Sequence, residues 1–340
     1  MKTKIKKWLQ EKSFLTKLTE IISFSATAAV ISMAIGIWLF PQNFVFALVR
    51  SLTPQIALGA LVLLVVHLFR NRLKLFLTIY GALMLLIPTF LTLLFPDNMA
   101  KIQKGKPRIV LAQFNVLKFN HEHESVIQSI KASEADIVSL QEVDGSWARD
   151  IHQNIAKDYP YSFSYPSENC CFGIALYSKI PLKNAQLKWL GGVPNIVADI
   201  QWQGEKIHVL SAHTHAPINK YKFEQRNIHI ADMSAYLKTI SSAKMVIGDF
   251  NSVPWDNFLN HFKQQTQLTD SRHSYSSTFP SFLGKFGIPI DYIFHSPELE
   301  CTGFTAVSPT SSDHKGIRGS FQWKSNSMVS KWRCTQYWPF

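Results

Sequence analysis

Six short polar segments of this chain carry residue types that bind metal ions and phosphate groups. Each lies where an apolar, strand-like run of sequence ends or begins. Carboxylate and amide oxygens are preferred by hard divalent cations, and histidines exchange protons near neutral pH. One such segment could be an ordinary turn or helix cap, but six of one chemical character indicate a shared site. The segments contain Asn115, Gln141-Glu142, His213-Thr214-His215, Asp249-Phe250-Asn251, Asp291 and Ser312-Asp313-His314.

The elements that must position these residues are strands, with a few helices between them. Amphipathic stretches predict helices over Glu124–Ser133, Ser146–Lys157 and Lys220–Ile240, and Gln203-Gly204 is typical of a hairpin turn. This mixture predicts one α/β domain with a substantial core. The short apolar runs that predict strands are Ile109–Asn115, Asp136–Glu142, Phe172–Ser178, Asn195–Trp202, Lys206–Ala212, Lys244–Gly248, Pro289–His295, Cys301–Val307 and Gly316–Trp323.

In order and spacing these segments resemble the endonuclease/exonuclease/phosphatase superfamily, which includes deoxyribonucleases, abasic-site endonucleases, bacterial sphingomyelinases and inositol polyphosphate phosphatases. The resemblance covers about residues 108–323. It implies an α/β fold in which two packed β-sheets form a sandwich flanked by helices, with the active site at one edge. The matching strings are Phe114-Asn115, Leu140-Gln141-Glu142, the segment from Gly173 to Ser178, Ala212-His213, the segment from Gly248 to Asn251, Ile290-Asp291-Tyr292 and Ser312-Asp313-His314.

The resemblance also implies a divalent metal ion, Mg²⁺ or Mn²⁺. Glu142 would supply a carboxylate ligand, Asn115 an amide oxygen or a water-mediated contact, and Asp313 a second carboxylate on the metal side. Magnesium keeps several of its water molecules, so few protein ligands are expected. The ion would offset the negative charge of a phosphate group.

Five further residues carry the catalytic roles that the resemblance implies. Asp249 would activate or orient the attacking water, and Asn251 would donate to a phosphate oxygen from the same turn. His314 would contact the scissile phosphate, with Asp291 fixing its tautomer or stabilising its charged form. His213 would donate to the transition-state oxygens or the leaving group. The reaction would proceed by direct attack of water, without a covalent enzyme intermediate.

Two pairs of histidines could mislead the assignment. His213 and His215 lie on the same face of a strand and compete for one role, and the position relative to Pro217 favours His213. His121 and His123 resemble a metal cluster, but they follow Asn115 in a loop, where the solvated start of a helix is the simpler interpretation.

The first hundred residues have a different character. Ile21–Phe40 is 20 residues long and Leu75–Phe95 is 21, and neither contains a charge. Between them Ile56–Phe69 is uncharged over 14 residues, which a buried helix of a soluble domain could also explain. We expect about three transmembrane helices, near 21–40, 50–69 and 75–95. The predicted organisation is an N-terminal membrane region over 1–100, a linker over 101–108, the phosphoesterase domain over 109–323 and a C-terminal tail over 324–340.

The net charge of +12 is concentrated in the same part of the chain. Residues 1–108 hold 14 lysines and arginines and three acidic residues, whereas the remainder has a net charge of only +1. Lysines before the first span place the N-terminus in the cytoplasm and favour an in–out–in–out path. The catalytic domain of a multi-pass protein of the cytoplasmic membrane would then be periplasmic or extracytoplasmic. Basic residues after the third span favour the opposite side.

The predicted function is a membrane-anchored, divalent-metal-dependent hydrolase of phosphate esters, with phosphodiesters preferred. Its partners would be the substrate and, through the N-terminal helices, the lipid bilayer. Three alternatives stay open: a nuclease acting on extracytoplasmic nucleic acid, a phospholipid head-group hydrolase, and a non-catalytic membrane-bound binding module. The near-neutral catalytic part does not favour nucleic acid. Four cysteines are too few for a disulfide-built scaffold, although a disulfide among them is an open alternative to buried thiols.

Overall fold

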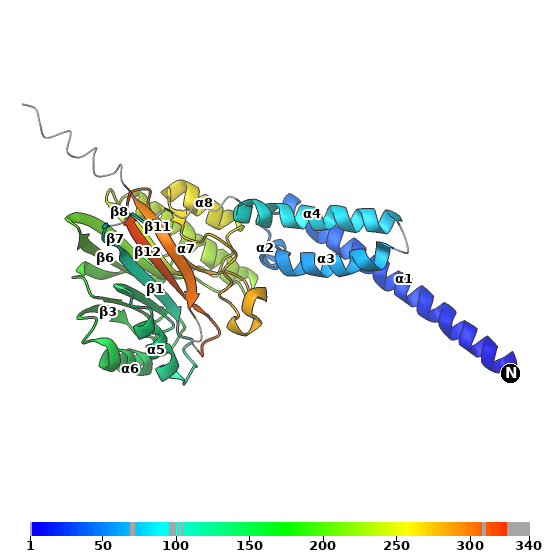
Figure 1. The fold of residues 1–340 in the computed structure, drawn as a ribbon, viewed down its shortest axis with the longest axis horizontal. Coiled ribbons are helices and arrows are strands. Elements are labelled where there is room, and N and C mark those ends of the chain that lie inside the picture. Colours follow the sequence, from blue (N-terminus) through cyan, green and yellow to red (C-terminus); the bar gives the residue numbers. More distant parts are fainter. Residues whose placement is uncertain are drawn as a thin grey trace, which may run out of the picture. The chain divides into compact units, whose positions relative to one another are not determined.

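The computed structural model describes residues 2–68, 72–94, 100, 102–103, 105–307 and 311–324. The chain divides into two compact units, Met1–Leu94 and Phe95–Phe340. Figure 1 shows the first as helices and the second as strands with helices around them. The predicted tail, apart from Lys324, lies outside the described residues, as does Cys334. Cys170, Cys171 and Cys301 are free thiols.

Two six-stranded sheets pack face to face in the second unit. Each contains one parallel pair among antiparallel neighbours: β1 (Ile109–Asn115) with β2 (Ile137–Gln141), and β7 (Glu205–His213) with β8 (Ala243–Asp249). This architecture confirms the predicted two-sheet sandwich. The first sheet has the order β11-β12-β1-β2-β4-β3, formed by Leu299–Val307, Gly316–Trp323, Ile109–Asn115, Ile137–Gln141, Ile174–Ser178 and Tyr161–Tyr165. The second has the order β5-β6-β7-β8-β10-β9, formed by Lys183–Leu190, Val193–Trp202, Glu205–His213, Ala243–Asp249, Asp291–His295 and Thr269–Asp270.

Helices cover the outer face of each sheet. Helices α5 (His123–Ala132) and α6 (Gly145–Ile155) pack on the first sheet, and α7 (Lys220–Lys238) and α8 (Asn257–Thr266) on the second. The helices α5 and α7 make the crossovers that the two parallel pairs require. Three of the four begin at a polar cap: the side chains of Asp144, Asn219 and Asp256 accept backbone N–H groups of the first turn.

The layer between the sheets changes character along the strands. Side chains two residues apart point to the same face of a strand. In β1, Ile109 and Leu111 belong to the apolar core between the sheets, and the next inward positions are Gln113 and Asn115. In the other central strands, too, the inward side chains are apolar at one end and polar at the other. At the polar end of the layer the inward residues are Gln113, Asn115, Ser139, Gln141, Ser211, His213, Asp249 and Asp291, all buried.

The segment before β1 is hydrogen-bonded to the sandwich of the second unit. The backbone N–H of Ala100 donates to the Cys301 carbonyl at 3.0 Å, and that of Gln103 donates to the Gln322 side chain at 3.3 Å. Lys106 reaches the carbonyl of Trp323. These partners lie on β11 and β12 at the end far from Asn115, because β12 is antiparallel to β1. The described part of the predicted linker is therefore attached to the sandwich at its apolar end.

The first unit consists of four helices, α1 (Lys2–Leu39), α2 (Phe44–Ser51), α3 (Thr53–Leu68) and α4 (Arg72–Leu94). Among the described residues, one stretch is long and apolar enough to cross a membrane, Glu11–Leu39, which contains an 18-residue window with a mean hydropathy of 1.9. Helices α2 and α3 pass the same test only as a pair bent by 70°. The described part of the first unit thus contains one candidate span, or two with the bent pair, and not the three or so that the sequence predicts.

The second predicted span is interrupted in the structure, whereas the third is only partly covered by the described residues. Pro54 cannot supply the N–H that would continue α2 into α3, so the second predicted span is broken near Leu52. The third prediction, 75–95, falls on helix α4, but the side chains of residues 86 and 88–94 lie outside the described part.

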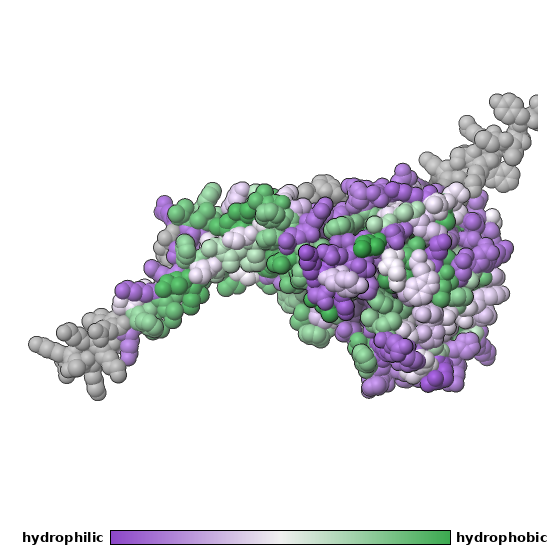
Figure 2. All heavy atoms as spheres, turned by 180° about the vertical axis from the view of Figure 1, so that it is seen from behind, coloured by the Kyte–Doolittle hydropathy of each residue, from purple (hydrophilic) through white to green (hydrophobic). Residues whose placement is uncertain are grey.

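The first unit also turns apolar side chains outward. Ile21, Phe24, Val62, Val65 and Phe76 are each more than 60% exposed. Figure 2 shows hydrophobic side chains gathered along these helices, whereas polar ones cover most of the second unit. Four polar side chains are buried in the helical interior instead and lie within hydrogen-bonding distance of one another: Ser23, Thr27, His67 and Thr78.

Candidate active site

Asp249 stands at the centre of the polar end of the sandwich. Its carboxylate is almost fully buried, and three side-chain nitrogens approach the single oxygen Oδ2. The Asn115 Nδ2 donates to it at 3.1 Å, and the Nε2 atoms of His213 and His314 each lie 3.7 Å away. Strand β8 reaches this position through Gly248, where φ is +149° and a Cβ atom would lie 1.9 Å from the Ala212 carbonyl oxygen.

Each histidine is oriented by a hydrogen bond from its other nitrogen. The Nδ1 of His213 lies 3.0 Å from the carbonyl oxygen of Cys171, and the Nδ1 of His314 lies 2.9 Å from Asp291 Oδ2. Because Nδ1 donates in both cases, Nε2 is directed toward Asp249. The rings of Phe172 and Phe279 pack against His213 and His314, with centroids 5.6 and 4.8 Å apart.

Asp291 is itself held by a chain of buried side chains between the sheets. The Nε2 of Gln113 donates to Asp291 Oδ1 at 2.8 Å and to Gln141 Oε1 at 2.7 Å. Gln141 donates in turn to Ser139, whose hydroxyl lies 2.6 Å from that of Ser211. This chain fixes the Asp291 carboxylate and, through it, the ring of His314.

The electrostatics follow from burial and from the pairing of Asp249 with Asp291 across β8 and β10. Burial and Asp291 raise the pKa of Asp249 to about 6, against the opposing effects of His314 and His213. Burial lowers the pKa of His314, but Asp291 and Asp249 together outweigh it and raise the value to about 10. Burial also raises the pKa of Asp313. His314 is therefore a cation at neutral pH.

Glu142 is more open than Asp249 and Asp291. It directly follows β2, with φ of +64°, and its side chain is 17% exposed, compared with 1% for Asp249. Its Oε1 accepts from Asn115 Nδ2 at 3.2 Å, and its Oε2 accepts from the Lys118 backbone N–H at 3.2 Å. Asn115 thus links Glu142 to Asp249, and its own Oδ1 accepts from the backbone N–H of Leu117.

The acidic side chains fit a divalent cation. Within the described residues, Asp249, Asp291 and His314 each offer a ligand atom, and these atoms lie within 4.8 Å of one another. In this buried group Asp291 and His314 already bond to each other. Glu142 is open to solvent, so an Mg²⁺ ion beside it can keep its water molecules. Four carboxylates, those of Glu142 and Asp313 included, surround only two histidines, so a cation would balance their charge.

Asn251 has a structural part in this arrangement. It takes φ of +46°, and its backbone N–H donates to Asp249 Oδ1 at 2.8 Å. Its side-chain Nδ2 donates to the Thr214 carbonyl at 2.9 Å, and its own carbonyl accepts from Arg226. The amide thus joins the ends of β7 and β8, in addition to any contact with phosphate that the sequence predicts for it.

Residues 112–314 match the Endonuclease/Exonuclease/phosphatase family. The chain belongs to this family. The matched range contains every residue that the sequence predicts for the site. Members of the family are phosphoesterases and nucleases, so the second unit has the fold of a hydrolase. No curated protein matches the chain in sequence.

Solved structures show the same fold in other members of the family. The catalytic domain of human Nocturnin, with bound sulfate, is 19% identical, with a TM-score of 0.54 over 67% of this chain and 97% of that one. A Bacteroides vulgatus endonuclease/exonuclease/phosphatase is 18% identical (TM-score 0.53, 64% and 100%). D. rerio TDP2, complexed with a single-strand DNA product, is 14% identical (TM-score 0.53, 63% and 99%). At these identities the likeness concerns the fold.

The histidines outside the family motif lie elsewhere. His215 packs edge-on against Phe172, with centroids 4.6 Å apart, and does not share the Asp249 contact of His213. His123 lies 2.7 Å from Asp150 and stacks on a tryptophan of α6. Both therefore have structural partners.

Sequence reasoning missed three residues that position the site. Gln113 was detectable, because a polar residue at an inward position of an apolar strand needs a buried partner. The carbonyl of Cys171 gives no such signal, since every residue has one. Phe279, which packs on His314, comes from a segment for which no element was predicted.

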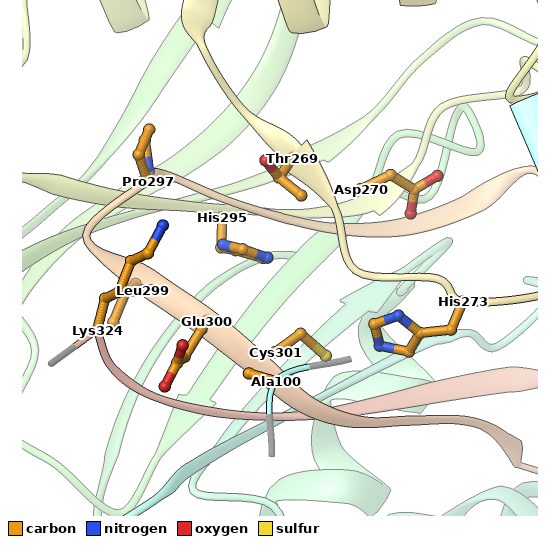
Figure 3. A pocket seen from close by; sticks show the side chains of 10 residues that line it. All are labelled: Ala100, Thr269, Asp270, His273, His295, Pro297, Leu299, Glu300, Cys301 and Lys324. Carbon is orange, nitrogen blue, oxygen red and sulfur yellow. The ribbon is translucent and has the colours of Figure 1, made fainter. Parts of the chain in front are cut away.

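A cavity of about 400 Å³ lies at the opposite end of the unit, near the end of β10 that carries His295 (Figure 3). None of the predicted site residues lines it. It also has no counterpart of the three-ligand group at Asp249 among the described residues. Its walls are formed by Ala100, Thr269, Asp270, His273, His295, Pro297, Leu299, Glu300, Cys301 and Lys324.

Proposed function

We propose that this chain is a divalent-metal-dependent hydrolase of phosphate esters, with phosphodiesters preferred. The observation that supports this best is the convergence of three side-chain nitrogens, from Asn115, His213 and His314, on one oxygen of Asp249. A phosphate group at this point would meet nitrogen donors and a carboxylate able to take a proton, as hydrolysis by water requires.

The surroundings of each residue decide which part of the reaction it carries out. Asp249, with a pKa of about 6, accepts the proton of the attacking water near neutral pH. The His314 imidazolium, kept charged by Asp291, donates to a phosphate oxygen and stabilises the charge that develops there. The Nδ1 of His213 donates to the Cys171 carbonyl, so its Nε2 donates to phosphate in the protonated form of the ring. Glu142 and Asp313, with Asn115 beside them, would hold Mg²⁺ or Mn²⁺. The ion supplies positive charge to the phosphate when bound.

The test is hydrolysis of bis-p-nitrophenyl phosphate by the full-length protein in detergent with Mg²⁺ or Mn²⁺. Asp249→Ala and His314→Ala are each expected to lower kcat by a factor of about 100 or more. The matched control is His261→Ala on the exposed face of α8, which should behave as the native protein. Equal turnover in all variants, independent of metal, would contradict the proposed mechanism.

A nuclease is the second candidate, because D. rerio TDP2, which shares the fold, was solved with a single-strand DNA product. The net charge of +1 over residues 109–340 does not favour it. The salt dependence of substrate binding and hydrolysis distinguishes the two candidate functions. A nuclease should lose affinity for its substrate steeply as salt rises, whereas hydrolysis of a small diester should change little.

We propose that the first unit anchors the chain in the cytoplasmic membrane through the long apolar stretch Glu11–Leu39 of α1. The outward apolar side chains of α1, α3 and α4 support this, since such a surface is costly in water. The lysines before Ile21 favour a catalytic unit on the outer side. A periplasm-active reporter fused near residue 105 should be active; a silent fusion would place the catalytic unit in the cytoplasm.

A further inference from the structure

Exposed apolar side chains surround the active site on three separate segments. We call them the apolar rim: Phe119, Ile218, Tyr221, Phe282, Leu283 and Phe286, which are 77, 71, 66, 80, 44 and 53% exposed. They are six of the ten large apolar residues exposed in the described part of the second unit. The other four, Ile102, Tyr161, Trp189 and Ile228, are scattered on other elements. Gathering of this kind marks an interaction surface.

Chain connections place the rim at the site. Phe119 follows Asn115 by four residues, next to Lys118, whose backbone N–H donates to Glu142. Ile218 follows His213 by five residues at the end of β7. The remaining members belong to a short 3₁₀ segment, η1 (Ser281–Phe286), or to the first turn of α7.

The segment η1 is bonded to the loop that carries the catalytic histidine. The backbone N–H of Ser281 donates to the Asp313 carbonyl at 2.7 Å, and its hydroxyl donates to the Ser312 carbonyl at 2.7 Å. Lys315 donates to the Gly284 carbonyl from the other side of His314. Phe282, the most exposed aromatic ring in the described part of the unit, therefore lies beside the site.

Lysines are interleaved with the rim. The ammonium group of Lys118 lies 5.9 Å from the Phe119 ring centre, and that of Lys285 lies 5.5 Å from the Phe286 ring centre. Lys220 and Lys222 flank Tyr221 in sequence. Apolar side chains beside basic groups are the combination that docks on a bilayer, where phosphate head groups lie above acyl chains.

We propose that the apolar rim docks on the surface of a phospholipid bilayer, so that the site receives its phosphodiester from a lipid head group. This rests on the proposed function. Single-stranded nucleic acid, which stacks its bases on aromatic rings, is the less suitable partner for two reasons. Ile218 and Leu283 offer no ring for stacking, and the catalytic unit as a whole is nearly neutral.

The test places the photoreactive residue benzoylphenylalanine at rim positions of the full-length protein, in nanodiscs of phosphatidylcholine and phosphatidylglycerol. The substitutions are Phe282→benzoylphenylalanine and Phe286→benzoylphenylalanine, which keep an aromatic ring. The matched controls carry the same residue at Ile228 and Trp189, which are 47 and 56% exposed but lie outside the rim. After irradiation, intact-protein mass spectrometry should show several-fold more lipid adducts at the two rim positions than at the controls.

A second measurement uses variants whose rim is polar. Phe282→Ser combined with Leu283→Ser should lower hydrolysis of phosphatidylglycerol vesicles, relative to bis-p-nitrophenyl phosphate, by about tenfold. Phe119→Ser, on a different segment, should act in the same direction. Equal lipid labelling at rim and control positions would overturn the proposal, as would labelling of an added single-stranded oligonucleotide in place of lipid. A failure to cleave the soluble diester would count against the proposed function alone, because photolabelling does not depend on turnover.

Discussion

At the scale of single residues, the neighbouring carboxylates of Asp249 and Asp291 accept hydrogen bonds from different donors. Asp291 accepts from Gln113 and His314, whereas Asp249 accepts from Asn115 and from the backbone of Asn251. The first pair of bonds directs Asp291 inward to the layer between the sheets. The second leaves Asp249 facing the Nε2 atoms of the histidines, so identical side chains on paired strands have different tasks.

Gln113 is expected to matter for both stability and activity. Gln113→Leu would leave Asp291 Oδ1 and Gln141 Oε1 without their buried donor, at a cost of about 1–3 kcal/mol for each acceptor. The loss of orientation at His314 should lower kcat on bis-p-nitrophenyl phosphate about tenfold, with a smaller effect on KM. Denaturant unfolding and steady-state kinetics measure the two effects.

The control for this prediction is Gln201→Leu, since Gln201 is exposed on β6. It should change neither quantity appreciably. If Gln113→Leu unfolds like the native protein and keeps the native kcat, the buried chain of side chains has no part in positioning His314.

How much of the site the sequence predicts depends on the kind of group involved. The predicted residues meet at the end of the sandwich because each lies at a strand terminus or within two residues of one, which alternation and turn residues reveal. They are Asn115, Glu142, His213, Asp249, Asp291 and His314. Backbone acceptors such as the Cys171 carbonyl depend on how a loop folds back, and no residue type encodes that. Which groups bind metal and which act on water stays a prediction.

At the scale of elements, the central strands are predictable, whereas two of the edge strands, β3 and β5, are not. The strands β1, β2 and β8 are buried along nearly their whole length, so they have continuous apolar runs. The edge strands β3 and β5 expose most of their residues and contain several lysines, serines and tyrosines. Their pairing comes from the neighbouring strand, and local sequence carries little trace of it.

Helix α7 carries a buried histidine that should make stability depend on pH. Burial lowers the pKa of His229 to about 3, and its Nε2 lies 3.0 Å from the side-chain oxygen of Asn195 on β6. An unfolded histidine binds a proton below about pH 6.5. Between these values the unfolded chain holds more protons, so the free energy of unfolding should fall by up to about 1.4 kcal/mol per pH unit as pH decreases.

The comparison variant is His229→Gln, which cannot titrate. Its free energy of unfolding, from denaturant titrations of the full-length protein between pH 7 and pH 4, should fall less steeply than that of the native chain. Parallel slopes in the two proteins would show that His229 is not the source of the acid sensitivity.

At the scale of the whole molecule, the sequence places an apolar first unit before a hydrophilic second one. Hydropathy identifies the apolar runs. It does not reveal that the helix of the second run is bent near Pro54, or that polar side chains far apart in sequence pack around His67. Composition is a property of segments, whereas these features depend on how segments pack. The fold of the second unit, by contrast, follows from the order of its strands and motif residues.

A metal ion that binds only the folded catalytic unit should stabilise it. Adding Mg²⁺ or Mn²⁺ to chelator-treated protein should raise the Tm of that unit by several degrees, because binding to the native state alone shifts the unfolding equilibrium. Glu142→Gln should reduce the shift, whereas Glu124→Gln, at the exposed start of α5, should leave it intact. An equal shift in Glu142→Gln would place the ion away from Glu142.

The attachment of residues 100–106 to β11 and β12 has a consequence for how such a chain can change. The chain joins the sandwich at one end of β1, and the candidate site occupies the other end, about 20 Å along the strand. Whatever precedes Ala100 can therefore be replaced without touching the groups around Asp249. We expect the catalytic unit to be portable: the segment 100–324 could be joined to another anchor, or to a leader peptide, and keep its chemistry.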